Sequence, residues 1–319
     1  MSVGVEVLNA IYASIQDLGR FRYRSLGVPV SGALDKLSVA YVNALVGNGP
    51  NTPVIEVIAS PIKLRVLNEA IVAVGGAWVD IKACGESVDP WEPVWLEEGC
   101  VIEVSPPKRG LVTYVAFAGG FEVDYVMGSA STYYRGGFGG FKGRLLRRGD
   151  VLRVKEVNLR DVWDRISSLE PPNWLTYRVP SKSACTILKA TEGVHADLIR
   201  KDLETILSST YSVSPKSDRM GYRLLGPELS EVKSLGKLPS IATDRGYVQV
   251  LPSSELAVLM ADAQTTGGYA VALHVLQPYV DILAQCGPYY RVKFSLVDLK
   301  EAEEITREYL TLLKEPTFT

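Results

Sequence analysis

Residues 101–117 read VIEVSPPKRGLVTYVAF, two short apolar runs separated by prolines and charges. Short runs divided by Gly, Pro or charged residues are typical of antiparallel sheets and barrels. Similar runs recur along the chain at residues 71–74, 79–83, 151–154, 247–250, 256–260, 271–276 and 290–294. We therefore expect a mainly β protein with a few helices.

Four segments show helical spacing or helix boundary signals instead. Asp35 can cap a helix that runs to Val46 and ends at Gly47. Apolar residues recur with helical spacing over 159–169 and 196–207, and Asp298 with Glu301 starts a last helix near the end of the chain.

A chain of 319 residues exceeds most single domains. Pro171 and Pro172 stop the second of these helices, and the strand pattern then starts again. We therefore expect a first domain over 1–157, a helical linker over 158–182 and a second domain over 183–319.

Composition excludes several classes of function. A formal net charge of -2 gives no basic field for nucleic acid. No apolar run reaches the roughly 18 residues of a membrane span. The strongest run, 70–79, is interrupted by Gly75 and Gly76 and reads as a buried strand pair. The opening stretch MSVGVEVLNAIYASI has no signal-peptide pattern, so a cytoplasmic location is expected.

The reactive residue types point to no metal or redox centre. The four cysteines are widely spaced without a C-x-x-C motif, so buried thiols and no metal site are expected. The two histidines, His195 and His274, favour structural roles. Neither a P-loop nor a G-x-G-x-x-G motif is present. The sequence therefore identifies no catalytic residue.

Residues 131–144, STYYRGGFGGFKGR, form the strongest candidate ligand site. Glycines allow close backbone approach and expose N–H groups, while the basic residues add positive charge that suits a carboxylate or a polarised carbonyl. A flexible hairpin tip with solvated charges is the alternative. The candidate binding residues here are Ser131, Thr132, Arg135, Gly136 and Gly137.

Residues 262–269, DAQTTGGY, form a second candidate at the end of an apolar strand. An amide such as that of Gln264 offers a donor and an acceptor together, as a small amide or ureido ligand requires. A polar turn is the alternative. The candidate binding residues are Gln264, Thr265, Thr266 and Gly267.

Two octets, RFRYRSLG over 20–27 and RMGYRLLG over 219–226, match at five positions. They indicate either a duplicated half or chance similarity. An acid precedes each first arginine, and for Asp17 and Asp218 a bracing ion pair is favoured slightly over catalysis. Arg20 and Arg219 are candidate ligand-binding residues, because a guanidinium fork recognises carboxylates. Tyr23 of the first octet is a further candidate.

Seven motifs follow one another over nearly the whole chain: SIQDLGR (14–20), LGVPVSGALD (26–35), NALVGN (43–48), GSASTY (128–133), RGGFGG (135–140), SDRMGYR (217–223) and QTTGGY (264–269). In kind and in order they resemble those of the allophanate hydrolase subunit 2 family. That family overlaps the C subunit of 5-oxoprolinase and the carboxyltransferase half of urea carboxylase. The resemblance implies two cyclophilin-like β-barrel domains.

The resemblance also implies a function and partners. The leading expectation is a subunit of an ATP-dependent 5-oxoprolinase, which opens the lactam 5-oxoproline to glutamate with a subunit 1-like partner and a third, lactam-binding subunit. ATP is expected on the complex rather than clearly on this chain. The alternatives are the carboxyltransferase component of a urea or amide carboxylase, with biotin on a separate carrier, and a regulatory protein that sequesters a kinase inhibitor.

Overall fold

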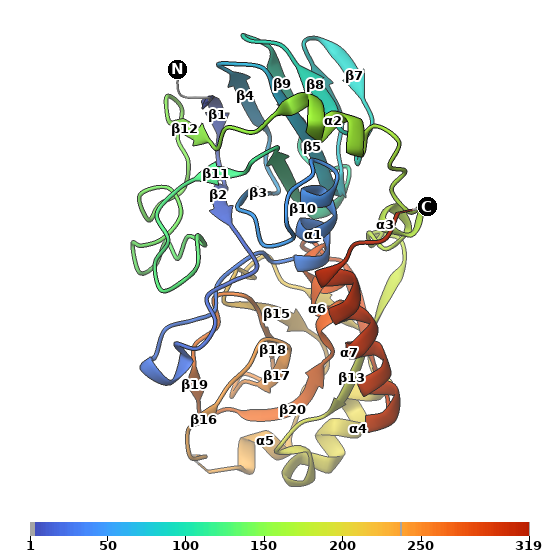
Figure 1. The fold of residues 1–319 in the computed structure, drawn as a ribbon. Helices are drawn as coiled ribbons and strands as arrows, with labels where there is room; N and C mark the ends of the chain where they lie inside the picture. The colour runs from blue at the N-terminus through green and yellow to red at the C-terminus, as the bar shows by residue number, and fades with distance from the viewer. Residues whose placement is uncertain (1–3, 237, 319) are drawn as a thin grey trace. The chain divides into compact units, whose positions relative to one another are not determined.

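The computed structural model describes residues 4–236 and 238–318, so the opening stretch lies outside the described residues at positions 1–3. Strands dominate over helices (Figure 1), and the expectation of a mainly β protein with a few helices is confirmed. The chain forms two compact units. The first domain comprises Met1–Arg20, Ser31–Val179 and Thr311–Thr319, and the second comprises Phe21–Val30 and Pro180–Leu310.

This division differs from a simple sequential one. A ten-residue segment near the start, Phe21–Val30, groups with the second domain, and the end of the chain groups with the first. The stretch expected as a helical linker also groups with the first domain as far as Val179. Apolar periodicity identifies elements but not the unit against which a connecting segment packs.

Two antiparallel sheets build the first domain. One has the order β11-β12-β1-β4-β9-β6-β7, and the other has the order β2-β3-β10-β5-β8. Their bounds are β1 Gly4–Ala10, β2 Ala13–Gln16, β3 Val54–Ile58, β4 Ile62–Val66, β5 Ala70–Trp78, β6 Ile81–Ala83, β7 Glu86–Val88, β8 Val94–Leu96, β9 Val101–Val104, β10 Arg109–Phe117, β11 Phe121–Glu122 and β12 Val151–Val154.

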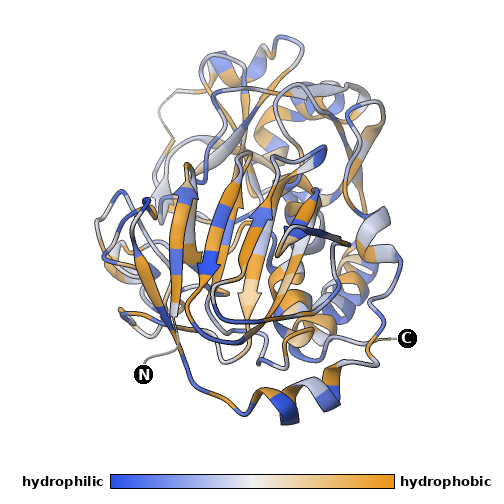
Figure 2. Cartoon of the chain, turned by 90° about the horizontal axis from the view of Figure 1, so that it is seen from above, coloured by the Kyte–Doolittle hydropathy of each residue, from blue (hydrophilic) through white to orange (hydrophobic). Residues whose placement is uncertain are grey.

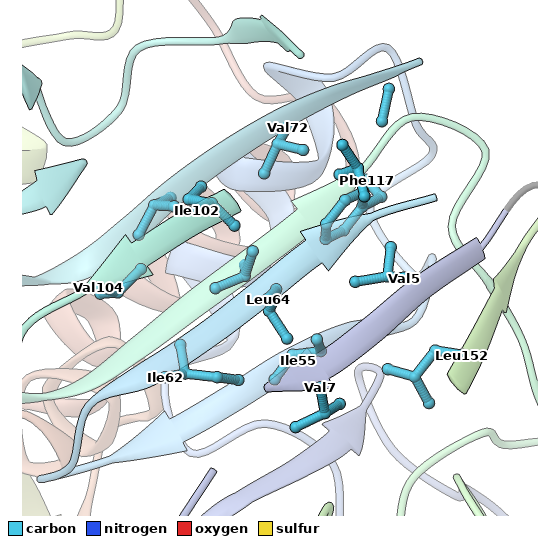
Figure 3. Close-up of a cluster of buried hydrophobic side chains, with 14 of the residues drawn as sticks. Val5, Val7, Ile55, Ile62, Leu64, Val72, Ile102, Val104, Phe117 and Leu152 are labelled. Atoms are coloured by element: carbon cyan, nitrogen blue, oxygen red, sulfur yellow. The ribbon is translucent and has the colours of Figure 1, made fainter. Parts of the chain in front are cut away.

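The core of the first domain is made by apolar side chains of both sheets. Val5, Leu64 and Ile102 come from the seven-stranded sheet, and Ile55 and Phe117 come from the five-stranded one. Figure 3 shows these side chains gathered in one cluster. Because successive residues of a strand point to opposite faces, alternating patterns such as IKLRV in β4 place their apolar members in this cluster.

Among the described residues, three helices lie wholly in the first domain: α1 Lys36–Ala44, α2 Leu159–Ile166 and α3 Trp174–Tyr177. The predicted cap of the first is confirmed, since the Asp35 carboxylate accepts a hydrogen bond from Ser38 N at 3.1 Å. Helix α1 packs on β5 and β10.

Residues 70–79 correct one expectation. All of them but the last form a single strand, β5, rather than a strand pair. A Cβ at Gly75 would lie 2.4 Å from the Trp91 ring, so this glycine makes room for a buried indole. Gly76 has φ +100°, and the pairing register with β10 shifts nearby. The glycines therefore serve packing and a bulge instead of a turn.

A closed seven-stranded barrel forms the second domain, in the order β13-β20-β17-β18-β15-β14-β21. The strands near the N-terminus in Figure 2, which belong to the first domain, show alternating hydrophobic and hydrophilic bands, as expected for sheets with one buried face. The strand bounds are β13 Cys185–Glu192, β14 Tyr211–Val213, β15 Gly221–Leu225, β17 Tyr247–Val250, β18 Leu256–Leu259, β20 Ala270–Val275 and β21 Arg291–Leu296, and a separate ribbon pairs β16 Ile241–Ala242 with β19 Thr266–Gly267.

The helical elements of the second domain are η1 Arg24–Leu26, η2 Ala196–Ile199, α4 Arg200–Ser208, α5 Glu231–Ser234, α6 Gln277–Ala284 and α7 Leu299–Lys314, the last as far as Leu310. Helices α6 and α7 run beside one another (Figure 1), and Tyr309 Oη donates to the buried Asp281 carboxylate at 2.9 Å. Arg245 Nη2 donates to the same carboxylate at 2.7 Å. A buried ion pair thus fastens α6 to the residues before β17.

The cysteines correct a second expectation. Cys84 and Cys100 form a disulfide with a Cα–Cα distance of 5.1 Å. Cys185 is an exposed free thiol and Cys286 is a buried one. Cys84 directly follows β6, Cys100 directly precedes β9, and the antiparallel pairing of these strands brings the two cysteines together. Sheet register, which the spacing of 16 residues does not reveal, decides the pairing.

Among residues 4–236 and 238–318, no helix is long and apolar enough to cross a membrane. The same residues contain no group of three or more His, Cys, Asp or Glu side chains that could hold a metal ion.

Candidate functional site

Asp17 is the centre of a buried polar cluster in the first domain. Its side chain is 0% exposed and accepts hydrogen bonds from Gly19 N at 2.8 Å and from Ser129 Oγ and Ala130 N at 2.7 Å each. The Ser131 hydroxyl donates to it as well. Hydroxyl and amide donors therefore surround this carboxylate, in place of the ion pair considered for Asp17 and Arg20.

Arg20 is fully buried beside this cluster. Its Nε donates to Val126 O at 3.0 Å and its Nη2 donates to Ser131 O at 2.8 Å. The guanidinium lies 4.8 Å from the centroid of the Phe138 ring. Arg20 thus ties the turn over 126–131 to the Gly-rich loop, and two of its donors serve the protein's own carbonyls.

The Gly-rich loop is a folded turn rather than a flexible tip. The N–H groups of Gly136 and Gly137 both donate to Tyr133 O at 3.0 Å. A Cβ at Gly139, which has φ +74°, would lie 2.1 Å from Ser131 O. The expectation that the amides of Gly136 and Gly137 are open to a ligand is therefore wrong, because the turn uses them. The glycines allow close approach to the protein's own backbone.

Five predicted residues of this region separate into two groups. Ser131 and Thr132 are buried, and Thr132 Oγ1 donates to Ile15 O at 2.9 Å. Arg135, Gly136 and Gly137 form the exposed tip of the loop. Only the second group lies where a ligand in solution can reach it without any rearrangement.

The other basic residues of the 131–144 segment, Lys142 and Arg144, have protein partners. Arg144 makes a bidentate pair with Asp150, with both N–O distances at 2.7 Å. This pairing lowers the pKa of Asp150 and raises the pKa of Arg144. Lys142 lies 5.1 Å from the centroid of the Phe141 ring. Part of the positive charge that we expected to bind a ligand, that of Arg144 and Lys142, therefore interacts with other residues of the protein.

In the second domain, Arg219 has a protein carboxylate as its partner. Its Nε and Nη2 donate to the two oxygens of Asp262 at 2.9 and 3.1 Å, and both side chains are buried. The adjacent Asp218 accepts from Met220 N and Gly221 N in a turn. The Arg219 guanidinium, which the sequence suggested would bind a ligand carboxylate, thus binds a carboxylate of the chain itself.

The two octets share letters but not local structure. Residues 219–226 run into the strand β15, whereas residues 20–27 are irregular and contain the short helix η1. Tyr23 lies at the start of η1, where its carbonyl accepts from Leu26 N at 3.0 Å. Arg24, which follows it, forms an ion pair with Asp244. The octets therefore do not place equivalent side chains in equivalent positions.

A cluster of amide and hydroxyl groups surrounds the 264–267 segment. Gln264 Nε2 donates to Gln249 Oε1 at 3.3 Å, and the Thr243 hydroxyl donates to Gln264 O. Thr243 N donates to Thr265 O at 3.0 Å. Thr266 and Gly267 form the short strand β19. The four residues predicted as a ligand site thus form an ordered segment braced by Gln249 and Thr243.

Sequence reasoning missed Gln249 and Thr243, which are both 1% exposed. In Tyr247–Val250 the glutamine occupies a polar position of an alternating strand pattern, which predicts a solvent-facing side chain. A polar side chain that turns out to be buried is the informative exception to such patterns.

The histidines make few contacts that suggest chemistry. His195 Nδ1 accepts a hydrogen bond from Val271 N at 3.1 Å, which holds a loop against β20. His274 packs edge-on against the Tyr247 ring with centroids 4.9 Å apart. Burial lowers the pKa of His274, and the nearby Asp244 charge opposes this shift.

Comparison with known proteins places these features in a family. The model of the family "Carboxyltransferase domain, subdomain A and B" matches residues 26–296. The chain is 32% identical to the C subunit of 5-oxoprolinase from Haemophilus influenzae, over 93% of this chain and 92% of that protein. It is 30% identical to the C subunit of 5-oxoprolinase from Escherichia coli, over 95% of each chain.

A solved structure shows the same fold. The urea amidolyase of K. lactis superposes with a TM-score of 0.86 at 25% identity, over 98% of this chain but only 20% of that much longer one. The resemblance inferred from the ordered motifs is confirmed by these matches. The chain belongs to the family of the carboxyltransferase domain, subdomains A and B.

Proposed function

We propose that this chain is a subunit of an ATP-dependent 5-oxoprolinase, which hydrolyses the lactam C–N bond of 5-oxoproline to give glutamate. The observation that carries the proposal is that each match covers most of this chain and most of the relative. The two relatives named as C subunits of 5-oxoprolinase match over 92% and 95% of their own length. The urea amidolyase of Lachancea kluyveri matches over only 17% of its length.

The second-domain amide cluster suits a lactam. A lactam presents one carbonyl acceptor and one N–H donor, and the half-buried Gln264 side chain contains both complementary groups. Thr265 is also half-buried and Thr266 is exposed, so their hydroxyls can supply further hydrogen bonds. We assign Gln264, Thr265 and Thr266 to the orientation of the substrate amide.

The first-domain loop offers a separate recognition element. Arg135 is exposed at the tip of a turn whose backbone is fixed by internal hydrogen bonds. A guanidinium on a rigid turn suits an anionic group such as a carboxylate, because the fork of donors matches two oxygens. We assign Arg135 to anion recognition.

ATP does not fit the Gly-rich loop. A phosphate cradle needs backbone N–H groups that point outward, whereas those of Gly136 and Gly137 donate to Tyr133 O. We therefore assign nucleotide binding to a partner subunit. A subunit 1-like protein and a third, lactam-binding subunit are the partners we propose.

Carboxyl transfer to urea or a related amide is the second candidate, supported by the structural likeness to the urea amidolyase of K. lactis. In this case biotin would arrive on a separate carrier, since the chain contains no A-M-K-M biotinylation motif. The same amide cluster would then face a urea nitrogen instead of a lactam.

The test is reconstitution of this chain with the subunit 1-like and lactam-binding partners. ATP-dependent release of glutamate from 5-oxoproline is measured for the wild type, for Arg135→Ala and for Arg153→Ala. Arg153 is an exposed arginine on β12 and serves as the matched control. We expect activity in the wild type and in Arg153→Ala, and a loss of at least about tenfold in Arg135→Ala.

An assembled wild-type complex that releases no glutamate would contradict the lactamase proposal. Urea-dependent consumption of carboxybiotin by the same preparation would then favour the second candidate. Equal activity of the two arginine variants would remove Arg135 from the site and leave the proposed reaction standing.

A further inference from the structure

Gln249 is a buried amide whose hydrogen bonding is incomplete. The residue lies in β17 and is 1% exposed. Its Oε1 accepts from Gln264 Nε2 at 3.3 Å, while its own buried Nε2 has no hydrogen-bond partner among residues 4–236 and 238–318. Leaving a buried donor unsatisfied is unfavourable, so an apolar side chain would serve the barrel's stability better. The glutamine therefore calls for a reason other than packing.

The backbone next to Gln249 is shaped to place this side chain. Along β17, Val248 pairs with Leu273 and Gln249 pairs with Val271, so Ala272 of β20 is an extra residue. A bulge of this kind redirects side chains and occurs often beside functional sites. On the other side, a Cβ at Gly267 would lie 2.9 Å from Gln249 Nε2. Only a glycine at position 267 leaves room for the amide where it stands.

The contact with Gln249 fixes which end of the Gln264 amide faces outward. The nitrogen end of Gln264 points to Gln249, so the oxygen end of the planar amide points away from it. The Gln264 Oε1 accepts no hydrogen bond among the described residues of the chain. An outward oxygen accepts an N–H donor and repels another acceptor.

We propose that Gln249 is a positioning residue that holds the Gln264 amide with its oxygen outward, so that this part of the second domain selects ligands carrying an amide N–H. The inference rests on the proposed function, in which the N–H is that of the lactam ring. It predicts discrimination between 5-oxoproline and its lactone analogue, the same ring and carboxylate with oxygen in place of N–H. The lactone oxygen would oppose the Gln264 oxygen.

The experiment compares the two rings in the reconstituted complex. KM for 5-oxoproline and the inhibition constant of the lactone are measured for the wild type, Gln249→Met and Gln249→Glu. Methionine keeps the side-chain volume but removes the Oε1 acceptor of Gln249, so the Gln264 amide is free to rotate and exchange its oxygen and nitrogen ends. Glutamate keeps an oxygen for Gln264 Nε2 and has no donor with which to reverse the pair. Thermal unfolding followed by circular dichroism checks that each variant is folded.

We expect the wild type to favour the lactam by roughly tenfold or more, because a site built around an N–H rejects the analogue that lacks it. In Gln249→Met the preference should fall to within about threefold of parity, chiefly through KM, with kcat changed less. In Gln249→Glu the preference should persist. A purely structural role would weaken the binding of both rings together and leave the ratio of the lactone inhibition constant to KM unchanged.

A second pair of variants keeps the inference testable if Gln249→Met does not fold. Gln264→Glu presents oxygen outward whatever its orientation and should retain the preference, whereas Gln264→Met should lose it. Suppose the wild-type complex turns over 5-oxoproline. The positioning role alone is then overturned if Gln249→Met keeps the full preference for the lactam over the lactone, or if Gln249→Glu loses that preference. A wild-type complex that neither releases glutamate nor binds the lactam by calorimetry overturns the proposed function and this inference together.

Discussion

Replacing Asp17 by alanine should destabilise the first domain strongly. The Asp17 carboxylate is fully buried and accepts from two backbone amides and two serine hydroxyls. The hydroxyls can turn toward other acceptors, but the amides of Gly19 and Ala130 are fixed by the chain. Each buried donor left unsatisfied costs about 1–3 kcal/mol. Relief from burying the charge offsets part of this, so we expect a loss of about 4 kcal/mol.

Tryptophan fluorescence measures this loss in one domain only. All five tryptophans, at positions 78, 91, 95, 163 and 174, lie in the first domain. In a urea titration with a slope of about 2 kcal/mol/M, a loss near 4 kcal/mol lowers the midpoint of the fluorescence transition by about 2 M. Because the chain has two domains, a probe confined to one of them avoids treating the whole chain as two-state.

Asp218→Ala is the matched control for Asp17→Ala. It also removes an acid that precedes an arginine in a repeated octet, but Asp218 is half-buried in the second domain. We expect the tryptophan transition to move by less than about 0.3 M in this variant, because Asp218 lies in the second domain whereas all five tryptophans lie in the first. Similar shifts in the two variants would refute the argument that the Asp17 cluster organises the first domain.

Single features of the two domains give three further predictions. Gly139→Ala should cost well over 3 kcal/mol, because its Cβ would lie 2.1 Å from Ser131 O, whereas Gly137→Ala, with φ +70° and no atom within 4 Å of its Cβ, should cost about 1–2 kcal/mol; urea titrations of both compare them. The lowered pKa of His274 means that the unfolded chain binds the proton first, so second-domain stability should fall as pH drops from about 6.5 toward the folded-state pKa; calorimetry at pH 7.5 and 5.5 should show a smaller fall in His274→Phe. Reducing the Cys84–Cys100 disulfide should lower first-domain stability by about 3 kcal/mol in the tryptophan assay, and a Cys84→Ser/Cys100→Ser double variant should not respond to the reductant.

Local patterns predicted the regular elements of the fold well. The helix after Asp35 begins at its expected cap, because capping depends only on a side chain and an amide three residues away. Alternation placed β9, β12 and β21, because the burial of one sheet face imposes a period of two. These features depend on neighbours along the chain. They can therefore be predicted from the sequence alone.

Features that depend on strand register or tertiary packing were missed or misread. The bulky neighbour of Gly75 is Trp91, which lies on a different segment, so the glycine pair looked like a turn. The pairing of Cys84 with Cys100 follows from how β6 lies against β9. Gln249 occupies a polar position of an alternating strand, and the closed barrel places it inside. In each case the deciding partner is distant along the chain.

The arginines show how this limit affects the assignment of function. The Asp17 carboxylate is bound by backbone amides and serine hydroxyls, and Arg219 pairs with Asp262, which lies 43 residues further along the chain. Arg245 likewise pairs with Asp281 on α6. Buried arginines with protein partners fasten loops and helices, and removing one partner would strand a buried charge. The proposed function accordingly assigns ligand recognition to other groups, the exposed Arg135 in the first domain and the Gln264 amide in the second.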